Sequence, residues 1–111
     1  LASWSGRSEP LMASLTIVYW RDIPAQVIAK AGRKSAKIML SDRFQEAIDR
    51  AAMRSGAAGT DEYLEDWRRG EPVAFKGDLE EAAQKLVLET EQSWTDDALA
   101  SLVKSNGRRE T

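Results

Sequence analysis

The first half of the chain has the composition and spacing of short β-strands. Residues 15–20 are β-branched and aromatic, which predicts a strand with Leu15, Ile17 and Tyr19 on one face and Thr16, Val18 and Trp20 on the other. A break at Arg21–Pro24 separates it from an alternating stretch at residues 25–30, and a turn around Gly32 leads to a third strand at residues 36–40. Because both connections are short, we expect the three strands to pair as an antiparallel meander.

The second half of the chain has the spacing of amphipathic helices. Apolar residues recur every three to four positions, and each stretch opens on a capping residue, which is Ser41 or Asp42, then Thr60, Asp78 and Thr95. These patterns predict helices at residues 42–55, 60–69, 78–94 and 95–106, the first of which ends at Gly56. The residues expected to face the core are Phe44, Ala47, Ile48, Ala51, Ala52, Tyr63, Leu64, Trp67, Leu79, Ala82, Ala83, Leu86, Thr90, Trp94, Leu99, Leu102 and Val103.

Together these elements predict an α+β domain, in which an N-terminal three-stranded antiparallel sheet is covered by about four C-terminal helices. Residues 72–75 could add a short fourth strand at an edge, where Pro72 is tolerated. A chain of 111 residues is long enough for one small domain, which we assign to residues 12–107. Residues 1–11 show no periodicity and are interpreted as an added leader or a disordered extension, and residues 108–111 as a frayed tail.

Composition removes several classes of chemistry. The chain has no Cys and no His, which excludes a thiolate nucleophile, a disulfide framework, a zinc finger and a histidine-based triad. Glu62 and Asp66 stand four residues apart, as two metal ligands could, but no second pair completes a site. The stretch Gly32–Ser35 lacks the upstream glycine of a phosphate-binding loop. We therefore predict no catalytic residue, no metal site and no cofactor, and we expect the protein not to be an enzyme.

Charge is unevenly distributed along the chain. The formal net charge is -2, which argues against wholesale binding to nucleic acid or to acidic lipid. Residues 1–56 hold nine basic and five acidic side chains, whereas residues 57–111 hold seven basic and thirteen acidic ones. Such a dipole can orient the encounter with a partner, and it can equally draw the two halves together within one fold.

Candidate partner-binding residues come from the basic half. Trp20 stands at a strand end beside Arg21, Asp22 and Pro24, where we expect it to be half exposed and able to anchor an interface. The basic side chains that follow could meet a phosphate or carboxylate of a partner, or they could serve only to protect a sheet edge. The candidates are Trp20, Arg21, Asp22, Arg33, Lys34 and Arg43, with Lys30 and Lys37 in the same basic stretch.

Several stretches also resemble a known family. They are Thr16–Val27, Gly32-Arg33, Arg43–Asp49, Ala51–Met53 and Tyr63-Leu64-x-x-Trp67. Together they are similar to the small bacterial virulence factor domain, which also occurs as a module within the staphylococcal conserved virulence factor C. The likeness is close from Met12 to Arg69 and loose over the acidic helical tail. It carries no catalytic or binding residues over to this chain.

The resemblance implies an accessory role. Members that stand alone are often encoded near enzymes of folate- and corrinoid-dependent methyl transfer, so it implies an accessory subunit beside such an enzyme, an association rather than a mechanism. Without His the chain has no lower ligand for cobalt, so we do not expect it to carry the corrinoid itself. Our leading expectation is a non-catalytic protein-interaction domain in the cytoplasm, with no membrane-spanning segment.

Two alternatives remain open. The first is an accessory or cofactor-binding protein of one-carbon metabolism, or an enzyme of it, which would hold a pterin or another one-carbon cofactor in a cleft between sheet and helices. The second is a nucleic-acid binder that uses the basic sheet, against which the acidic second half counts. The sequence leaves open the oligomeric state and the partner, which could be a methyl-transfer enzyme.

Overall fold

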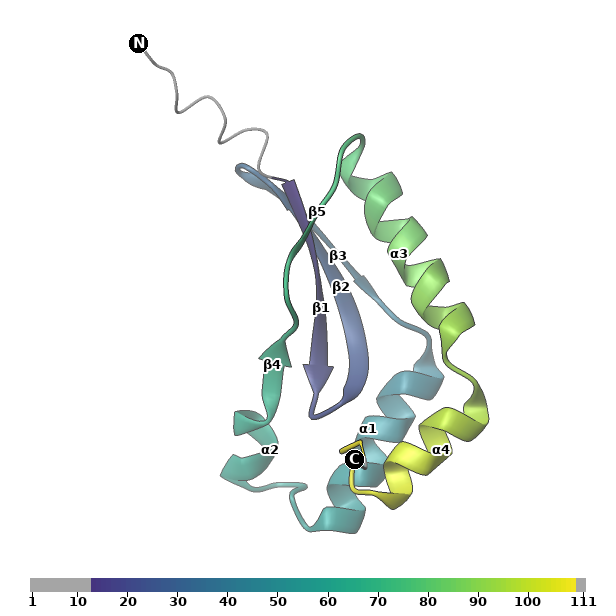
Figure 1. Ribbon diagram of the computed structural model, residues 1–111. Coiled ribbons are helices and arrows are strands. Elements are labelled where there is room, and N and C mark those ends of the chain that lie inside the picture. Colours follow the sequence, from purple (N-terminus) through teal and green to yellow (C-terminus); the bar gives the residue numbers. More distant parts are fainter. Residues whose placement is uncertain (1–12, 110–111) are drawn as a thin grey trace.

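The computed structural model describes residues 13–109 and places an antiparallel sheet beside four helices (Figure 1). The strands are β1 (Ala13–Trp20), β2 (Ile23–Ala31), β3 (Lys34–Met39), β4 (Trp67–Arg69) and β5 (Val73–Ala74). The helices are α1 (Asp42–Ser55), α2 (Asp61–Glu65), α3 (Leu79–Ser93) and α4 (Asp96–Lys104). The predicted α+β class is confirmed, while the predicted leader or extension at residues 1–11 lies outside the described residues.

The N-terminal meander is confirmed, with strands longer than predicted. The sheet order is β3-β2-β1-β4 with every pair antiparallel, and β5 also pairs with β1. The break after β1 is only two residues long, and Pro24 lies inside β2 opposite Tyr19. The ladder shifts register between Val18 and Tyr19, so Pro24 sits beside an irregularity, where its missing N–H costs little.

The predicted helix at residues 60–69 is wrong in its second half. α2 ends at Glu65, and Trp67–Arg69 form β4 instead, opposite Val18–Trp20 of β1. The local pattern favoured a helix, but the edge of β1 offers these residues backbone hydrogen-bond partners. Leu64, expected in the core, is 68% exposed, because the shortened helix is a single surface turn. The short edge strand expected at residues 72–75 is confirmed as β5.

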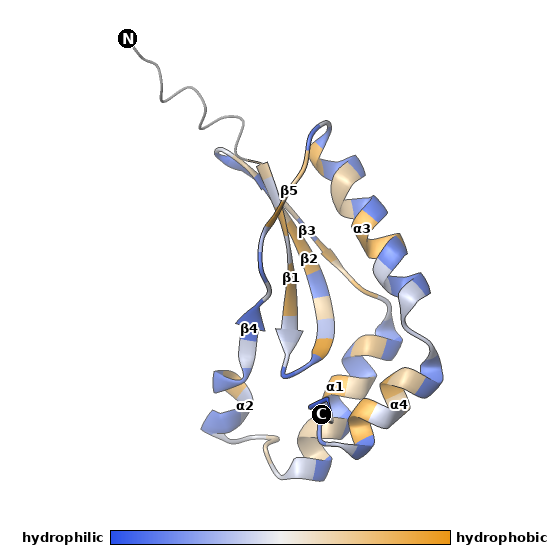
Figure 2. Ribbon diagram, in the orientation of Figure 1, coloured by the Kyte–Doolittle hydropathy of each residue, from blue (hydrophilic) through white to orange (hydrophobic). Residues whose placement is uncertain are grey.

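Two hydrophobic clusters hold the helices on the sheet. The larger one surrounds Trp20 and Phe44 and brings α1 and α4 against one end of the sheet. The smaller one joins Val27 and Ala29 of β2 to Ala83 of α3. Figure 2 shows hydrophobic and hydrophilic residues alternating along α3, as expected of a helix with one side against a sheet.

The later helices begin at the predicted capping residues. The Asp78 carboxylate accepts a hydrogen bond from the Glu81 N–H at 3.0 Å, and the Thr95 hydroxyl accepts one from the Ala98 N–H at 3.0 Å. Ser41 precedes α1 without capping it, because its hydroxyl bonds to another helix. Within residues 13–109 every helix is too short or too polar to cross a bilayer.

The sheet has two different faces. Side chains alternate across a strand, so the strand residues of the smaller cluster, among them Leu15, Ile17 and Val27, lie on the face that α3 covers. We call the other face the open face. Its central apolar residues, Val18 and Ile28, are each 9% exposed. Its exposed members are Lys30, Ser35, Lys37, Met39, Arg69 and Ala74.

Candidate functional site

The six residues predicted to bind a partner lie in three separate places. Trp20, Arg21 and Asp22 are at the turn between β1 and β2, and Arg33 and Lys34 are at the turn between β2 and β3. Figure 1 shows these turns at opposite ends of the sheet. Arg43, the last of the six, lies in the first turn of α1. Closeness in sequence therefore does not make these residues one surface.

The expectation that Trp20 is half exposed is wrong. Its side chain is 0% exposed and belongs to the larger hydrophobic cluster. The indole N–H donates to the Tyr63 carbonyl at 2.8 Å, and the two rings lie 5.7 Å apart between centroids. Trp67, opposite Trp20 in β4, packs against the same cluster. A ring enclosed in this way stabilises the fold and offers no surface to a partner.

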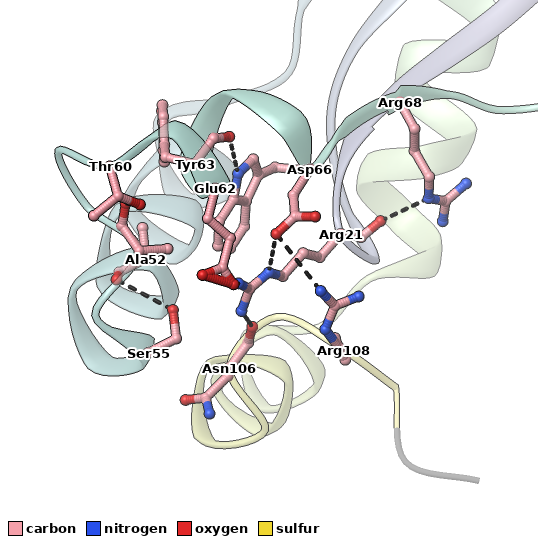
Figure 3. Close-up of polar contacts among 12 residues, drawn as sticks. Arg21, Ala52, Ser55, Thr60, Glu62, Tyr63, Asp66, Arg68, Asn106 and Arg108 are labelled. Atoms are coloured by element: carbon pink, nitrogen blue, oxygen red, sulfur yellow. Dashed lines mark hydrogen bonds and ion pairs between the residues drawn. The ribbon is translucent and has the colours of Figure 1, made fainter.

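Arg21 is buried as well and makes polar contacts on three sides (Figure 3). Its Nε donates to the Asp66 carboxylate at 2.9 Å, and its Nη1 donates to the Asn106 carbonyl at 2.7 Å. Its Nη2 lies 3.3 Å from the exposed Glu62 carboxylate. The guanidinium also stacks over the Trp20 ring, 4.5 Å from the ring centroid. These contacts satisfy a charge that would otherwise be costly to bury.

Further ion pairs extend this group into what we call the turn cluster: Arg21, Asp22, Glu62, Asp66, Arg68 and Arg108. Arg68 donates to the Arg21 carbonyl at 3.0 Å and pairs with Asp22 at 3.1 Å, while Arg108 lies 3.5 Å from Asp66. The backbone N–H of Arg109 donates to the Asp22 carboxylate. Three arginines thus face three carboxylates, so the cluster is balanced in charge and each carboxylate is paired with a guanidinium. It ties the β1–β2 turn to α2, to β4 and to the chain beyond α4.

Arg43 is engaged within the fold. It pairs with Asp96 at 3.0 Å and with Glu91 at 3.2 Å, and its Nη2 donates to the Glu91 carbonyl at 2.7 Å. Ser41 donates to the same Glu91 carboxylate from its N–H at 2.6 Å and from its hydroxyl at 2.8 Å. Burial alone would raise the pKa of Glu91, but the hydrogen bonds from Ser41 and Arg43 outweigh it, so this pKa is lowered. The group joins α1 to α3 and α4.

Arg33 and Lys34 remain exposed, and they continue a basic surface. The five strands contain five basic residues and no acidic one, whereas α2, α3 and α4 together contain nine acidic and two basic residues. Lys30, Lys37 and Arg69 are exposed on the open face. Two of these bases belong to the predicted basic stretch, and the period of two along β2 and β3 could have placed them on one face. Arg69 could not be placed, because β4 was not predicted.

A groove of about 660 Å³ lies between β1 and α3, where the cofactor cleft of the first alternative would have to be. Its floor is apolar and includes Leu15, Ile17 and Leu86. Its rim carries both signs of charge, from Glu71, Lys76, Asp78, Glu81, Lys85 and Glu89. Four carboxylates and two lysines thus surround the apolar floor. Over the described part of the chain, no group of three acidic side chains is close enough to hold a metal ion.

Comparison with known families now gives the chain a place. The family model described as Virulence factor matches residues 18–103. The chain belongs to the virulence factor family. The match runs from β1 into α4, so the family likeness includes the acidic helices and continues well past Arg69. It also takes in Arg21, Glu62, Asp66 and Arg68 of the turn cluster. No curated protein and no solved structure matches this virulence factor domain.

Proposed function

We propose that this virulence factor domain is a non-catalytic interaction module, or small accessory subunit, that binds an acidic surface of another protein through its open face. The observation that supports the proposal is the separation of charge between the basic sheet and the acidic helices α2, α3 and α4, while α1 is balanced in charge. Lys30, Lys37 and Arg69 are exposed on the open face, the strands carry no carboxylate, and the basic turn of Arg33 and Lys34 continues the charge. Complementary charge of this kind favours encounter and orientation with an acidic partner.

The side chains of the open face favour a protein over a nucleic acid. Proteins that bind single strands stack bases on aromatic side chains, whereas the open face has the aliphatic side chains of Val18 and Ile28 at its centre and Met39 at its β3 edge. Tyr19 lies on the other side of the sheet, where the Arg68 guanidinium stacks over its ring at 4.5 Å. The acidic helices would also repel a phosphate backbone that extended past the sheet.

The arrangement of the other charges supports an accessory role. Arg21, Arg43 and Arg68 are each paired with carboxylates of the same chain, so their charge is neutralised by ion pairs that join helices and strands within the fold. The bases of the open face have no ion pair among the described residues. Those bases therefore keep positive charge that could meet a partner, on a face of the sheet that holds no carboxylate.

The test compares two double variants of equal charge change. Lys30→Glu with Lys37→Glu reverses charge on the open face, and Lys85→Glu with Lys104→Glu reverses two exposed lysines on α3 and α4. Binding of labelled poly-glutamate, as a probe for an acidic protein surface, is measured by fluorescence anisotropy at low and moderate salt. We expect the sheet variant to bind at least about tenfold more weakly and the helix variant to stay within about twofold.

A single-stranded oligothymidine of similar charge is titrated in parallel. If it binds the unchanged domain more tightly than poly-glutamate and depends on the same two lysines, the site is a nucleic-acid site and the proposal is overturned. Equal weakening by both double variants would show that binding follows net charge and not the open face. Loss confined to the sheet variant, with poly-glutamate preferred, supports the proposal.

A further inference from the structure

One edge of the sheet is formed by β3, which pairs only with β2 in the sheet order. Its register with β2 runs from Ala31 opposite Lys34 to Gln26 opposite Met39. The turn between them has two residues, so the closing pair of Ala31 and Lys34 must be one that exchanges both backbone hydrogen bonds. The hydrogen-bonded pairs then alternate along the ladder from that point.

The alternation fixes which backbone groups of β3 point out of the sheet. Ala36 and Ile38 bond inward to β2, so the N–H and C=O groups of Ser35, Lys37 and Met39 point outward. Within residues 13–109 these outward groups bond to no backbone outside the ladder and to no side chain. The side chains of the same three residues are exposed on the open face, with Met39 at 59%. β3 therefore presents a free edge next to the basic surface.

We propose that the acidic partner adds an extended segment to β3 as a further strand of the sheet. This inference rests on the proposed function, because it specifies how the open face would be used. An added strand satisfies the outward N–H and C=O groups of β3 and gains affinity from the main chain. Lys37 and Lys30 then lie on the same face as alternate side chains of the added segment.

Charge decides which occupant the edge accepts. In an antiparallel pairing of two copies centred on Lys37, each Lys37 would face the other, and like charges directly opposite are unfavourable. An acidic side chain at that place is favourable, and an apolar one suits the exposed Met39. The segment we infer thus has an acidic and an apolar residue two positions apart, with small or branched residues between them on the side of Ala36 and Ile38.

The probe is a labelled peptide, Glu-Val-Glu-Val-Leu-Val-Glu, compared with Val-Glu-Glu-Val-Val-Leu-Glu, which has the same composition without the alternation. Ser35→Pro removes one outward N–H without changing charge, and Pro is tolerated at an edge where its N faces solvent. Ser35→Ala keeps the N–H and serves as its matched control. We expect the alternating peptide to bind at least about tenfold more weakly to Ser35→Pro, and within about twofold to Ser35→Ala.

Two methylated peptides make the test independent of the protein variants. Methyl groups on the amides of Glu and Leu block an antiparallel addition, and methyl groups on the amides of Val block a parallel one. One of these two peptides must therefore lose binding to the unchanged domain. If both bind as well as the parent peptide, or if the scrambled peptide binds equally, strand addition is overturned. Weakening by Lys30→Glu with Lys37→Glu in that same experiment would still leave the open face as the binding surface, so the two proposals fail separately.

Discussion

The two tight turns of the meander meet the same backbone demand in opposite ways. Each has two residues, and the first of them takes a left-handed conformation, with φ +56° at Arg21 and +61° at Gly32. Glycine adopts this region without steric strain, whereas a residue with a side chain is strained there. A β-carbon added at Gly32 would have no atom within 4 Å. The Arg21 side chain, by contrast, is held by hydrogen bonds to Asp66 and Asn106 and by stacking over the Trp20 ring. The strained turn is thus the one whose surroundings hold its side chain in place.

The comparison teaches that a basic residue is a candidate for binding only after its internal partners are known. Arg21 and Lys34 were both predicted to bind a partner, and both stand at turns of the same sheet. One is 6% exposed and paired within the fold, and the other is exposed at the turn between β2 and β3. The stability of the fold should therefore depend on the end of the sheet with the β1–β2 turn, and association with a partner on the end with the β2–β3 turn.

The largest effect is expected from replacing the charge at each end by a side chain of similar length. Arg21→Met leaves the Asp66 carboxylate and the Asn106 carbonyl without their donor, which should cost about 3 kcal/mol in the free energy of unfolding. Lys34→Met removes an exposed charge and should change it by less than about 0.5 kcal/mol. Urea denaturation at neutral pH measures both. Equal losses at the two ends would contradict the structural role given to the turn cluster.

Much of the fold follows from local pattern, and the prediction failed where a distant partner decides. The cores of β1, β2 and β3 and the caps of α3 and α4 depend on neighbours a few residues away, so their patterns could be interpreted directly. β4 depends on the edge of β1, which lies about fifty residues earlier in the chain. Residues 60–69 were predicted to be a helix because acidic residues near the start and basic residues near the end complement a helix dipole.

The candidate residues show the same limit. Trp20 is at a strand end in sequence, but Tyr63 and Trp67 enclose it. No feature of the sequence near Trp20 indicates that Tyr63 and Trp67 pack against it, so its burial could not be predicted. The basic stretch was recognised, and period-two alternation would have placed Lys30 and Lys37 on one face of the sheet. What the sequence could not separate was the bases that the fold neutralises from those that it leaves exposed.

A smaller effect is expected from adding one methyl group at each end. Gly32→Ala and Gly107→Ala both force a side chain into left-handed backbone, at φ +61° and +87°, which should cost about 1 kcal/mol each. The new methyl of Gly107→Ala would also stand 3.0 Å from the buried Trp20 ring and 3.4 Å from Arg21 Cδ. We expect this overpacking to bring its total cost to about 2 kcal/mol. Thermal unfolding of the two variants side by side gives the difference, and a costlier Gly32→Ala would refute the comparison.

The smallest effect is expected from lowering the pH. The strands contain no carboxylate, whereas each ion pair that involves a helix needs an ionised carboxylate. The pKa of Glu91 is lowered in the fold, because the hydrogen bonds from Ser41 and Arg43 outweigh the effect of burial. The contribution of Glu91 to stability is therefore present above its ordinary pKa and is lost as the pH falls through the lowered pKa. Glu91→Gln should cost about 1 kcal/mol at neutral pH, and this difference from the unchanged domain should shrink toward zero below about pH 4.

Glu89→Gln is the matched control, because Glu89 is an exposed carboxylate on the same helix that pairs with no base among the described residues. Its difference from the unchanged domain should stay within about 0.5 kcal/mol, as for other exposed substitutions. Urea midpoints from neutral pH downward give both differences on one axis. A Glu91→Gln penalty that persists in acid would assign the cost to the hydrogen bonds that an amide NH2 cannot accept in place of a carboxylate oxygen, and the charge of Glu91 would then contribute nothing to joining α1 with α3.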